Sequence, residues 1–406
     1  MKTTLAPALL NAPGFDLSWV VLAVRLWRTP SPGSSTKGTG LIFADAEAAS
    51  SRRRTILSRV GYSLVFVSTL AIVGVGVLPS PFIVQQPGPT FDTLGSVSAD
   101  GEEVPLIDIP LQETFPTTGS LTMLTVSFVG NREQPLSWFE TAAAWLDPSK
   151  AVVPVDSVYP DGRTQQQSSK ESRVEMEVSQ QEAVAAALSE LDYKFSSKLT
   201  IEGVDENGAA GDSLKQGDVV VSVNGKKFTY VSQLRAELAD NGIDKEATVI
   251  VRRDGKNRTF ELTPQMSSGE RPAPILGVLV AAEYKFPFDV SIQLENVGGP
   301  SAGSMFALGI IDKLTEGNLN GGADVAGTGT ISGEGVIGPI GGIRQKMHGA
   351  VAAGAEYFLA PERNCDEVVN NIPDGITVFA VETLDDSLAA LKGIGSGKTD
   401  DLPTCS

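Results

Sequence analysis

Residues 297–311 read VGGPSAGSMFALGII, a turn of small residues followed by an apolar run that predicts a helix from Met305 to Ile311. Small neighbours leave the Ser301 hydroxyl exposed, and backbone N–H groups at the start of a helix can face a developing oxyanion. Ser301 is therefore a candidate nucleophile. The turn that would form the oxyanion site consists of Gly299, Pro300 and Ala302. The alternative is a Gly-Pro-Ser turn whose serine only caps a helix.

A nucleophilic serine needs a base, and residues 341–355 (GGIRQKMHGAVAAGA) offer two candidates, Lys346 and His348, the only histidine of the chain. Two residues apart on a helix, these side chains point about 200° apart, so both cannot serve one site. A lysine can act as a general base when burial lowers its pKa. The alternative for Lys346 is a solvated lysine on a helix surface.

These two segments resemble the proteolytic domain of the Lon family. GPSAG at residues 299–303 carries that family's serine, and residues 328–346 carry its second signature with a lysine at the expected spacing. The resemblance implies that Ser301 is the nucleophile, that Lys346 is the general base, and that Thr328 orients the lysine amine. The implied enzyme is a serine endopeptidase with a Ser-Lys dyad and no cofactor or metal.

The chain departs from the Lon pattern in two places. Many Lon enzymes carry an acidic residue shortly before the serine, whereas this chain has Gly298 there, and Glu295 is the nearest acid upstream. Lon also carries an ATPase, but the only similar motif, GIGSGKT at residues 393–399, has Lys392 where a phosphate loop needs its first glycine, and no helix can follow it. We expect an ATP-independent enzyme that cleaves unfolded or exposed polypeptides.

Residues 198–264 alternate short apolar segments with glycine turns and contain one helix, Val231 to Ala239. This order resembles a PDZ domain, which implies that an extended peptide binds at a sheet edge. The loop that would hold a terminal carboxylate should lie near Leu191 to Lys198, and no glycine occurs there. Whether chain termini bind is left open.

A 19-residue stretch without charge, Val60 to Leu78, is long enough to cross a membrane as a helix. Arg52, Arg53, Arg54 and Arg59 precede it, and the next basic residue is Arg132. This asymmetry predicts a cytoplasmic N-terminus and extracytoplasmic domains after the span. The alternatives are a buried core helix and a cleaved signal peptide. Prolines at 79, 81, 87 and 89 predict a stiff spacer beyond the membrane.

The amino-acid composition argues against nucleic acid and zinc as binding partners. The net charge of -17 argues against nucleic acid binding, and two cysteines with one histidine cannot supply a typical zinc site. Outside the cytoplasm, Cys365 and Cys405 can form a disulfide that holds the tail, although two free thiols are the alternative. The Lon resemblance also implies a homo-oligomer, a hexameric ring.

The expected fold is α+β, with a membrane helix and a PDZ-like domain placed before or within a Lon-type proteolytic domain. In this organisation the region between the anchor and the PDZ-like unit helps to complete the protease fold. We also expect a polar, mobile segment at residues 165–172 and a helix at residues 174–191. The expected parts are a flexible leader (1–55), an anchor (56–79), a juxtamembrane region (80–190), a PDZ-like domain (191–266), a proteolytic domain (275–392) and a flexible tail (393–406).

A second hypothesis is a membrane-tethered PDZ adaptor whose Lon-like part is a silent scaffold. The presence of both Ser301 and Lys346 favours the enzyme. A chymotrypsin-like protease with a PDZ domain is a third class, but it needs a histidine before its serine, and this chain has none there.

Overall fold

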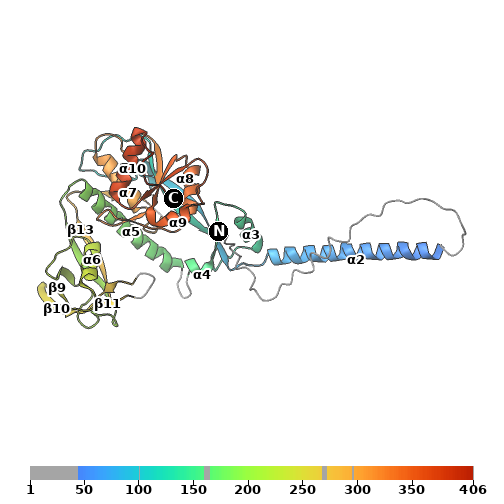
Figure 1. Cartoon of the computed structure of the whole chain (residues 1–406), viewed down its shortest axis with the longest axis horizontal. Coiled ribbons are helices and arrows are strands. Elements are labelled where there is room, and N and C mark those ends of the chain that lie inside the picture. Colours follow the sequence, from blue (N-terminus) through green and yellow to red (C-terminus); the bar gives the residue numbers. More distant parts are fainter. Residues whose placement is uncertain (1–43, 100, 160–164, 268–271, 295–296, 406) are drawn as a thin grey trace, which may run out of the picture. The chain divides into compact units, whose positions relative to one another are not determined.

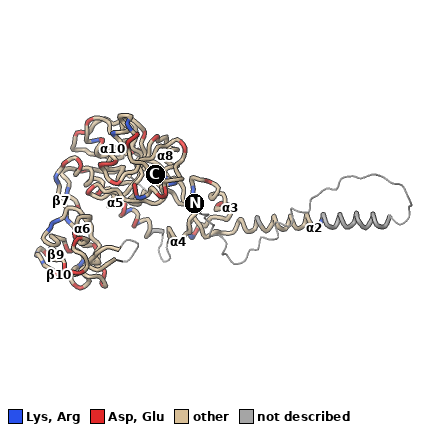
Figure 2. Tube along the Cα trace, viewed as in Figure 1, with Lys and Arg blue, Asp and Glu red and all other residues tan. Residues whose placement is uncertain are grey.

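The computed structural model describes residues 44–99, 101–159, 165–267, 272–294 and 297–405, and the chain divides into two compact units, Met1–Ile72 and Val73–Ser406. The leader expected at 1–55 lies largely outside the described residues, but its last part is helical rather than flexible, because helix α2 spans Ala44–Gly76 (Figure 1). Among the described residues, one helical stretch, Arg59–Gly76, is long and apolar enough to cross a membrane. The sequence has no charged residue from Val60 to Phe91, and the part of α2 next to the folded domains is drawn without charged positions in Figure 2.

A six-stranded sheet forms the centre of the second unit, in the order β19-β18-β15-β5-β1-β6. Strands β15, β18 and β19 run parallel to β5, whereas β1 is antiparallel to both β5 and β6. Strands from before and after the PDZ region therefore share one sheet. The strands are β1 (Phe82–Asp92), β5 (Ser120–Val129), β6 (Ala151–Pro154), β15 (Asp324–Gly327), β18 (Tyr357–Pro361) and β19 (Thr377–Val381).

The proline-rich segment after helix α2 is part of this sheet, so the expected spacer is wrong for residues 82–92. Pro87 pairs with Val126, and the register then shifts before Thr90 pairs with Leu124. Such a bulge leaves residues unpaired and so tolerates prolines that cannot donate a ladder hydrogen bond.

Helices cover both faces of the six-stranded sheet. Because side chains alternate along a strand, Met123 packs in the core with Phe306, and its neighbour Leu124 packs with Met347 on the opposite face. The first face is covered by α5 (Gln165–Glu190), α7 (Gly303–Leu314) and α10 (Leu384–Ser396), and the second by α8 (Ile343–Ala352) and α9 (Cys365–Val368). Helix α5 begins at Gln165, so the mobile segment expected at 165–172 is wrong.

A five-stranded sheet in the order β10-β9-β8-β7-β13 packs against helix α6 (Val231–Asn241) around its own apolar core. Buried Asp218 forms an ion pair with the partly buried Arg253, 2.6 Å away, and this pair joins two of its segments. The sheet extends beyond the range expected for the PDZ-like domain, because its edge strand comes from residues assigned to the proteolytic domain. The strands are β7 (Ser196–Val204), β8 (Val219–Val223), β9 (Ala247–Arg253), β10 (Lys256–Leu262) and β13 (Val278–Lys285).

Short elements connect these layers. They are β2 (Ser96–Ala99), β3 (Glu102–Pro105), β4 (Ile107–Asp108), α3 (Trp138–Trp145), α4 (Val155–Val158), β11 (Gln265–Met266), β12 (Pro274–Ile275), β14 (Ser291–Ile292), β16 (Thr330–Ile331), β17 (Ile337–Gly338) and the 3-10 helix η2 (Glu362–Asn364).

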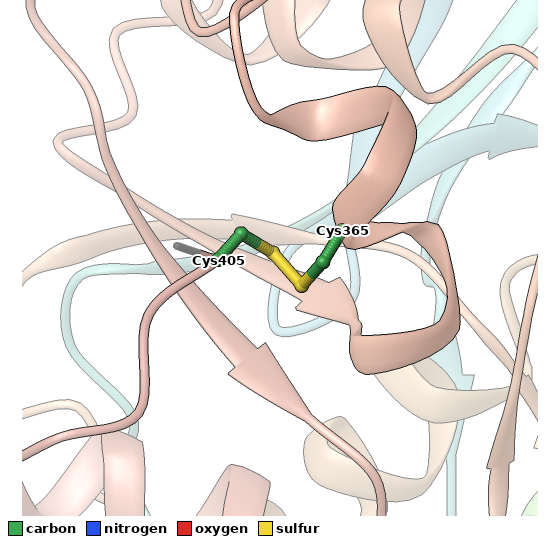
Figure 3. Close-up of a disulfide and its surroundings, with 2 residues drawn as sticks. All are labelled: Cys365 and Cys405. Atoms are coloured by element: carbon green, nitrogen blue, oxygen red, sulfur yellow. A yellow bond between two sulfur atoms is a disulfide. The ribbon is translucent and has the colours of Figure 1, made fainter. Parts of the chain in front are cut away.

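The C-terminal tail is fastened to the sheet. Cys365 and Cys405 form a disulfide with Sγ atoms 2.02 Å apart (Figure 3), and the Ala380 N–H donates to the carbonyl of Pro403. The first tail residues continue α10 to Ser396. The expected flexible tail is therefore wrong.

Candidate active site

The structure brings together the three residues that the Lon resemblance selects. Lys346 Nζ lies 2.7 Å from Ser301 Oγ and donates to Thr328 Oγ1 at 2.8 Å. The Thr328 hydroxyl donates in turn to the carbonyl oxygen of Ser301 at 2.9 Å. One threonine thus contacts both the lysine amine and the backbone of the serine.

Burial determines the charge state of the lysine. Lys346 lies on α8 and is 1% exposed. Desolvation disfavours the ammonium form and lowers the pKa of Lys346 to about 7. A large fraction of the amine is therefore neutral near pH 7, as a general base requires.

His348 lies away from this group. It shares α8 with Lys346 but lines a separate polar pocket of about 480 Å³ with Arg344, Asn370 and Asp374. Burial and the nearby Arg344 charge lower the pKa of His348. The structure therefore matches the helical argument that only one of the two side chains can reach the serine.

The turn before α7 holds Ser301 in place. Gly299 has a φ of +88°, a value that favours glycine, and its N–H donates to the carbonyl of Ser172. That N–H is taken by the fold, and Pro300 has none. Of the turn residues that we assigned to an oxyanion site, Ala302 therefore keeps its N–H as a candidate donor, together with Ser301 itself.

Helix α5 supplies contacts that the sequence did not indicate. The Ser179 hydroxyl donates to the carbonyl of Pro300 at 2.9 Å. Earlier on the same helix, the carbonyl of Ser172 accepts the hydrogen bond from the Gly299 N–H. A Cβ on Gly298 would lie 2.7 Å from Ser172 Cβ, so an acidic side chain has no room there. The apolar periodicity of α5 could reveal its buried face, but not these long-range polar contacts.

A second group of contacts from α5 reaches the PDZ region. The Glu182 carboxylate accepts hydrogen bonds from the Tyr284 hydroxyl at 2.8 Å and from the Gly333 N–H. Burial raises the pKa of Glu182 although both hydrogen bonds oppose that shift. The carboxylate joins strand β13 to the turn that follows β16.

A cavity of about 280 Å³ opens beside Ser301. Its walls come from β5 (Met123 to Ser127), from Met176 of α5, and from Val297, Gly298 and Ala302 near the serine. The lining is mainly apolar, and the candidate nucleophile lies in its wall. The site therefore has room for a side chain next to the Ser301 hydroxyl.

Comparisons with known proteins identify two kinds of domain in this chain. Residues 296–392 match the model of the Lon protease (S16) C-terminal proteolytic domain, and residues 173–263 match that of the PDZ domain. Lon protease 2 of Herpetosiphon aurantiacus is 45% identical over 107 residues, which is 25% of this chain and 13% of that relative. Lon protease of Haemophilus influenzae is 38% identical over 116 residues, 27% of this chain and 14% of that relative.

Among solved structures, the PDZ domain of the SdrC-like protein from Listeria innocua is 15% identical, with a TM-score of 0.19, and covers 20% of this chain and 92% of that one. This chain spans only about an eighth of the length of the Lon relatives named above. The chain contains a Lon-type proteolytic domain and a PDZ domain.

Proposed function

We propose that this protein is a membrane-anchored, ATP-independent serine endopeptidase. The observation that carries the proposal is a lysine amine, 1% exposed, at 2.7 Å from the hydroxyl of Ser301. A buried amine with a lowered pKa next to a serine on a turn of small residues fits nucleophilic catalysis. A lysine with no catalytic role would stay at the surface, because burying its ammonium group costs free energy.

In the proposed mechanism, Ser301 Oγ attacks the carbonyl carbon of the peptide bond while neutral Lys346 takes the hydroxyl proton. Backbone N–H groups of Ser301 and Ala302 stabilise the oxyanion. The protonated lysine then gives its proton to the leaving amine, and an acyl-enzyme remains. Water, deprotonated by Lys346, hydrolyses this ester. Thr328 holds the amine in place throughout.

The substrate would bind as an extended chain along β5. Strand β15 pairs with β5 only from Ser120 to Met123, whereas β5 continues to Val129 along the wall of the cavity. A peptide added at the uncovered part of β5 could form backbone hydrogen bonds there and place a side chain in the cavity. Such binding requires an unfolded or exposed segment, and the sequence contains no Walker motif that could drive unfolding.

A second peptide site would lie on the PDZ domain. Strand β13 is the outermost strand of the five-stranded sheet and has α6 beside it. The chain enters β13 through Gly277, which has a φ of +75°. The turn that leads into this edge strand is therefore at residues 276–277, whereas the sequence placed the corresponding loop near 191–198 and left binding of a terminal carboxylate open. We propose that polypeptide substrates dock at this edge.

The basic residues before the span favour a single-pass orientation with a cytoplasmic N-terminus, which places both domains outside the cytoplasm. Polypeptides of the cell envelope are then the accessible substrates. Assembly into a hexameric ring, implied by the Lon resemblance, stays a prediction. The net charge of -17 continues to argue against nucleic acid as a partner.

Cleavage of unfolded casein by the full-length protein in detergent tests the proposal. Wild type should cleave casein, whereas Ser301→Ala and Lys346→Ala should not. Ser396→Ala and Lys398→Ala, at exposed positions near the C-terminus, are matched controls that should keep wild-type activity. Equal cleavage by all five proteins would exclude the dyad. If wild type leaves both casein and a panel of unfolded envelope proteins intact, the PDZ adaptor becomes the better hypothesis.

A further inference from the structure

The region directly after the membrane helix folds back on a short helix, α3. The Trp138 N–H donates to the carbonyl of Leu78 at 3.2 Å, and the Ser80 N–H donates to the carbonyl of Leu136 at 2.7 Å. The ring of Phe139 lies against Gly76, where an added Cβ would be 2.1 Å from it. Helix α3 is thereby attached to the end of the candidate span.

Large apolar side chains on α3 and at the residue that directly follows it are exposed instead of buried. Phe139 is 47% exposed, Trp145 60% and Leu146 87%, and Val77 and Leu78 of the adjoining segment are 65% and 53% exposed. Thr141 and Ala144, on the opposite side of α3, are buried. The exposed apolar surface therefore continues from the end of the span onto this helix.

Few charges lie on this surface, and Asp147, which directly follows Leu146, is paired with Lys150 at 3.2 Å. Glu140 is the only charged residue of α3, and its carboxylate accepts hydrogen bonds from the backbone and hydroxyl of Ser137 at the helix start. No charge occurs between Val60 and Phe91. Tryptophan and other aromatic side chains that continue an apolar span are typical of the headgroup level of a bilayer.

We propose that α3 lies in the interfacial layer of the membrane, with Phe139, Trp145 and Leu146 inserted between lipid headgroups and upper acyl chains. This inference rests on the membrane anchor of the proposed function. Lipid is the partner that would cover these apolar side chains, because the exposed apolar surface begins where the candidate span ends. A short amphipathic helix held at this level binds by burying its apolar face. Strands β1 and β6, which contact α3 in the fold, would then lie near the membrane surface.

The four tryptophans of the chain make the test specific, because two belong to α3 and the others are Trp19 and Trp27. The full-length protein with Trp19, Trp27 and Trp138 replaced by phenylalanine keeps only Trp145. It is reconstituted into vesicles whose lipids carry bromine near the headgroup or near the bilayer centre. We expect shallow bromine to reduce Trp145 emission about two-fold and deep bromine to reduce it less, since interfacial helices lie roughly 5–10 Å into the boundary.

The control protein lacks all four native tryptophans and carries Ile243→Trp, at an exposed apolar position of the PDZ domain, where no quenching is expected. Adding Phe139→Ser and Leu146→Ser to the Trp145 protein should weaken the quenching while the chain stays inserted. Resistance to alkaline extraction measures insertion independently. If the chain is inserted but Trp145 is not quenched, the interfacial helix is wrong and the anchor stands. The same conclusion holds if Trp145 emission is blue-shifted without quenching, because a second copy of the chain then covers α3 in place of lipid. A chain that is extracted overturns the anchor, and the inference with it.

Discussion

The hydroxyl of Ser179 donates a 2.9 Å hydrogen bond to the carbonyl oxygen of Pro300, the residue directly before the candidate nucleophile. Ser179 is 3% exposed, so bulk water cannot take over its hydrogen bond to the Pro300 carbonyl. We predict that Ser179→Ala lowers kcat about ten-fold with little change in KM, because a small displacement of a nucleophile is costly. Steady-state kinetics on a peptide substrate measure this. Ser169→Ala, exposed on the same helix, is the control, and an equal loss in both variants would contradict the positioning role.

The pH dependence of the reaction should follow Lys346. Its pKa is lowered to about 7, and only the neutral amine can accept the serine proton. We predict that kcat/KM falls about ten-fold from about pH 8 to about pH 6, since this ratio reports the ionisation of the free enzyme. A profile that stays flat through this range would show that another group, or a fully neutral lysine, acts as the base.

The same burial predicts an effect on stability. The pKa of Lys346 is lower in the folded protein than in the unfolded chain, where it is near 10.5, so the unfolded chain binds more protons between these values. Burying the lysine therefore destabilises the fold most below about pH 7, and the cost shrinks as the pH rises toward 10.5. Lys346→Met should stabilise the protein by about 3 kcal/mol more at pH 6 than at pH 9. Urea unfolding at both pH values measures the difference, and a pH-independent effect would contradict burial of an ionisable amine.

Removal of the disulfide should destabilise the proteolytic domain. Cys365 and Cys405 are 40 residues apart, and a crosslink over such a loop contributes about 4 kcal/mol through the entropy of the unfolded chain. We predict that Cys405→Ser lowers the unfolding temperature and frees the tail to proteolysis. Casein cleavage at low temperature should persist, because neither cysteine contacts the dyad. Unchanged stability in Cys405→Ser and in Cys365→Ser would show that the bridge does not form in the isolated protein.

Much of the site could be predicted from sequence because its parts are local. Ser301 and Lys346 each lie in a segment whose small residues and spacing can be recognised in the sequence. Lys346 and His348 are two residues apart on α8, so their side chains point in different directions. The strands and helix of the PDZ region were equally visible, since apolar alternation and glycine turns mark them.

Other parts depend on distant segments and could not be predicted. The first turns of α5 are polar, so no apolar period marks them, although glutamine, lysine and glutamate favour helices. The proline-containing β1 is read as a spacer until its partner β5 is known, and β13 belongs to the PDZ sheet only through its pairing with β7. The contact between Ser179 and Pro300 joins residues 121 apart in sequence, which no local pattern records.

Covalent labelling of Ser301 tests the dyad most directly. The full-length protein is treated with an activated phosphonate at about pH 8, and the modified residue is located by peptide mass mapping. We predict a single adduct on Ser301, formed roughly 100-fold more slowly in Lys346→Met, the magnitude expected when a general base is removed. Labelling at another residue, or an equal rate in Lys346→Met, would contradict the proposed Ser-Lys dyad.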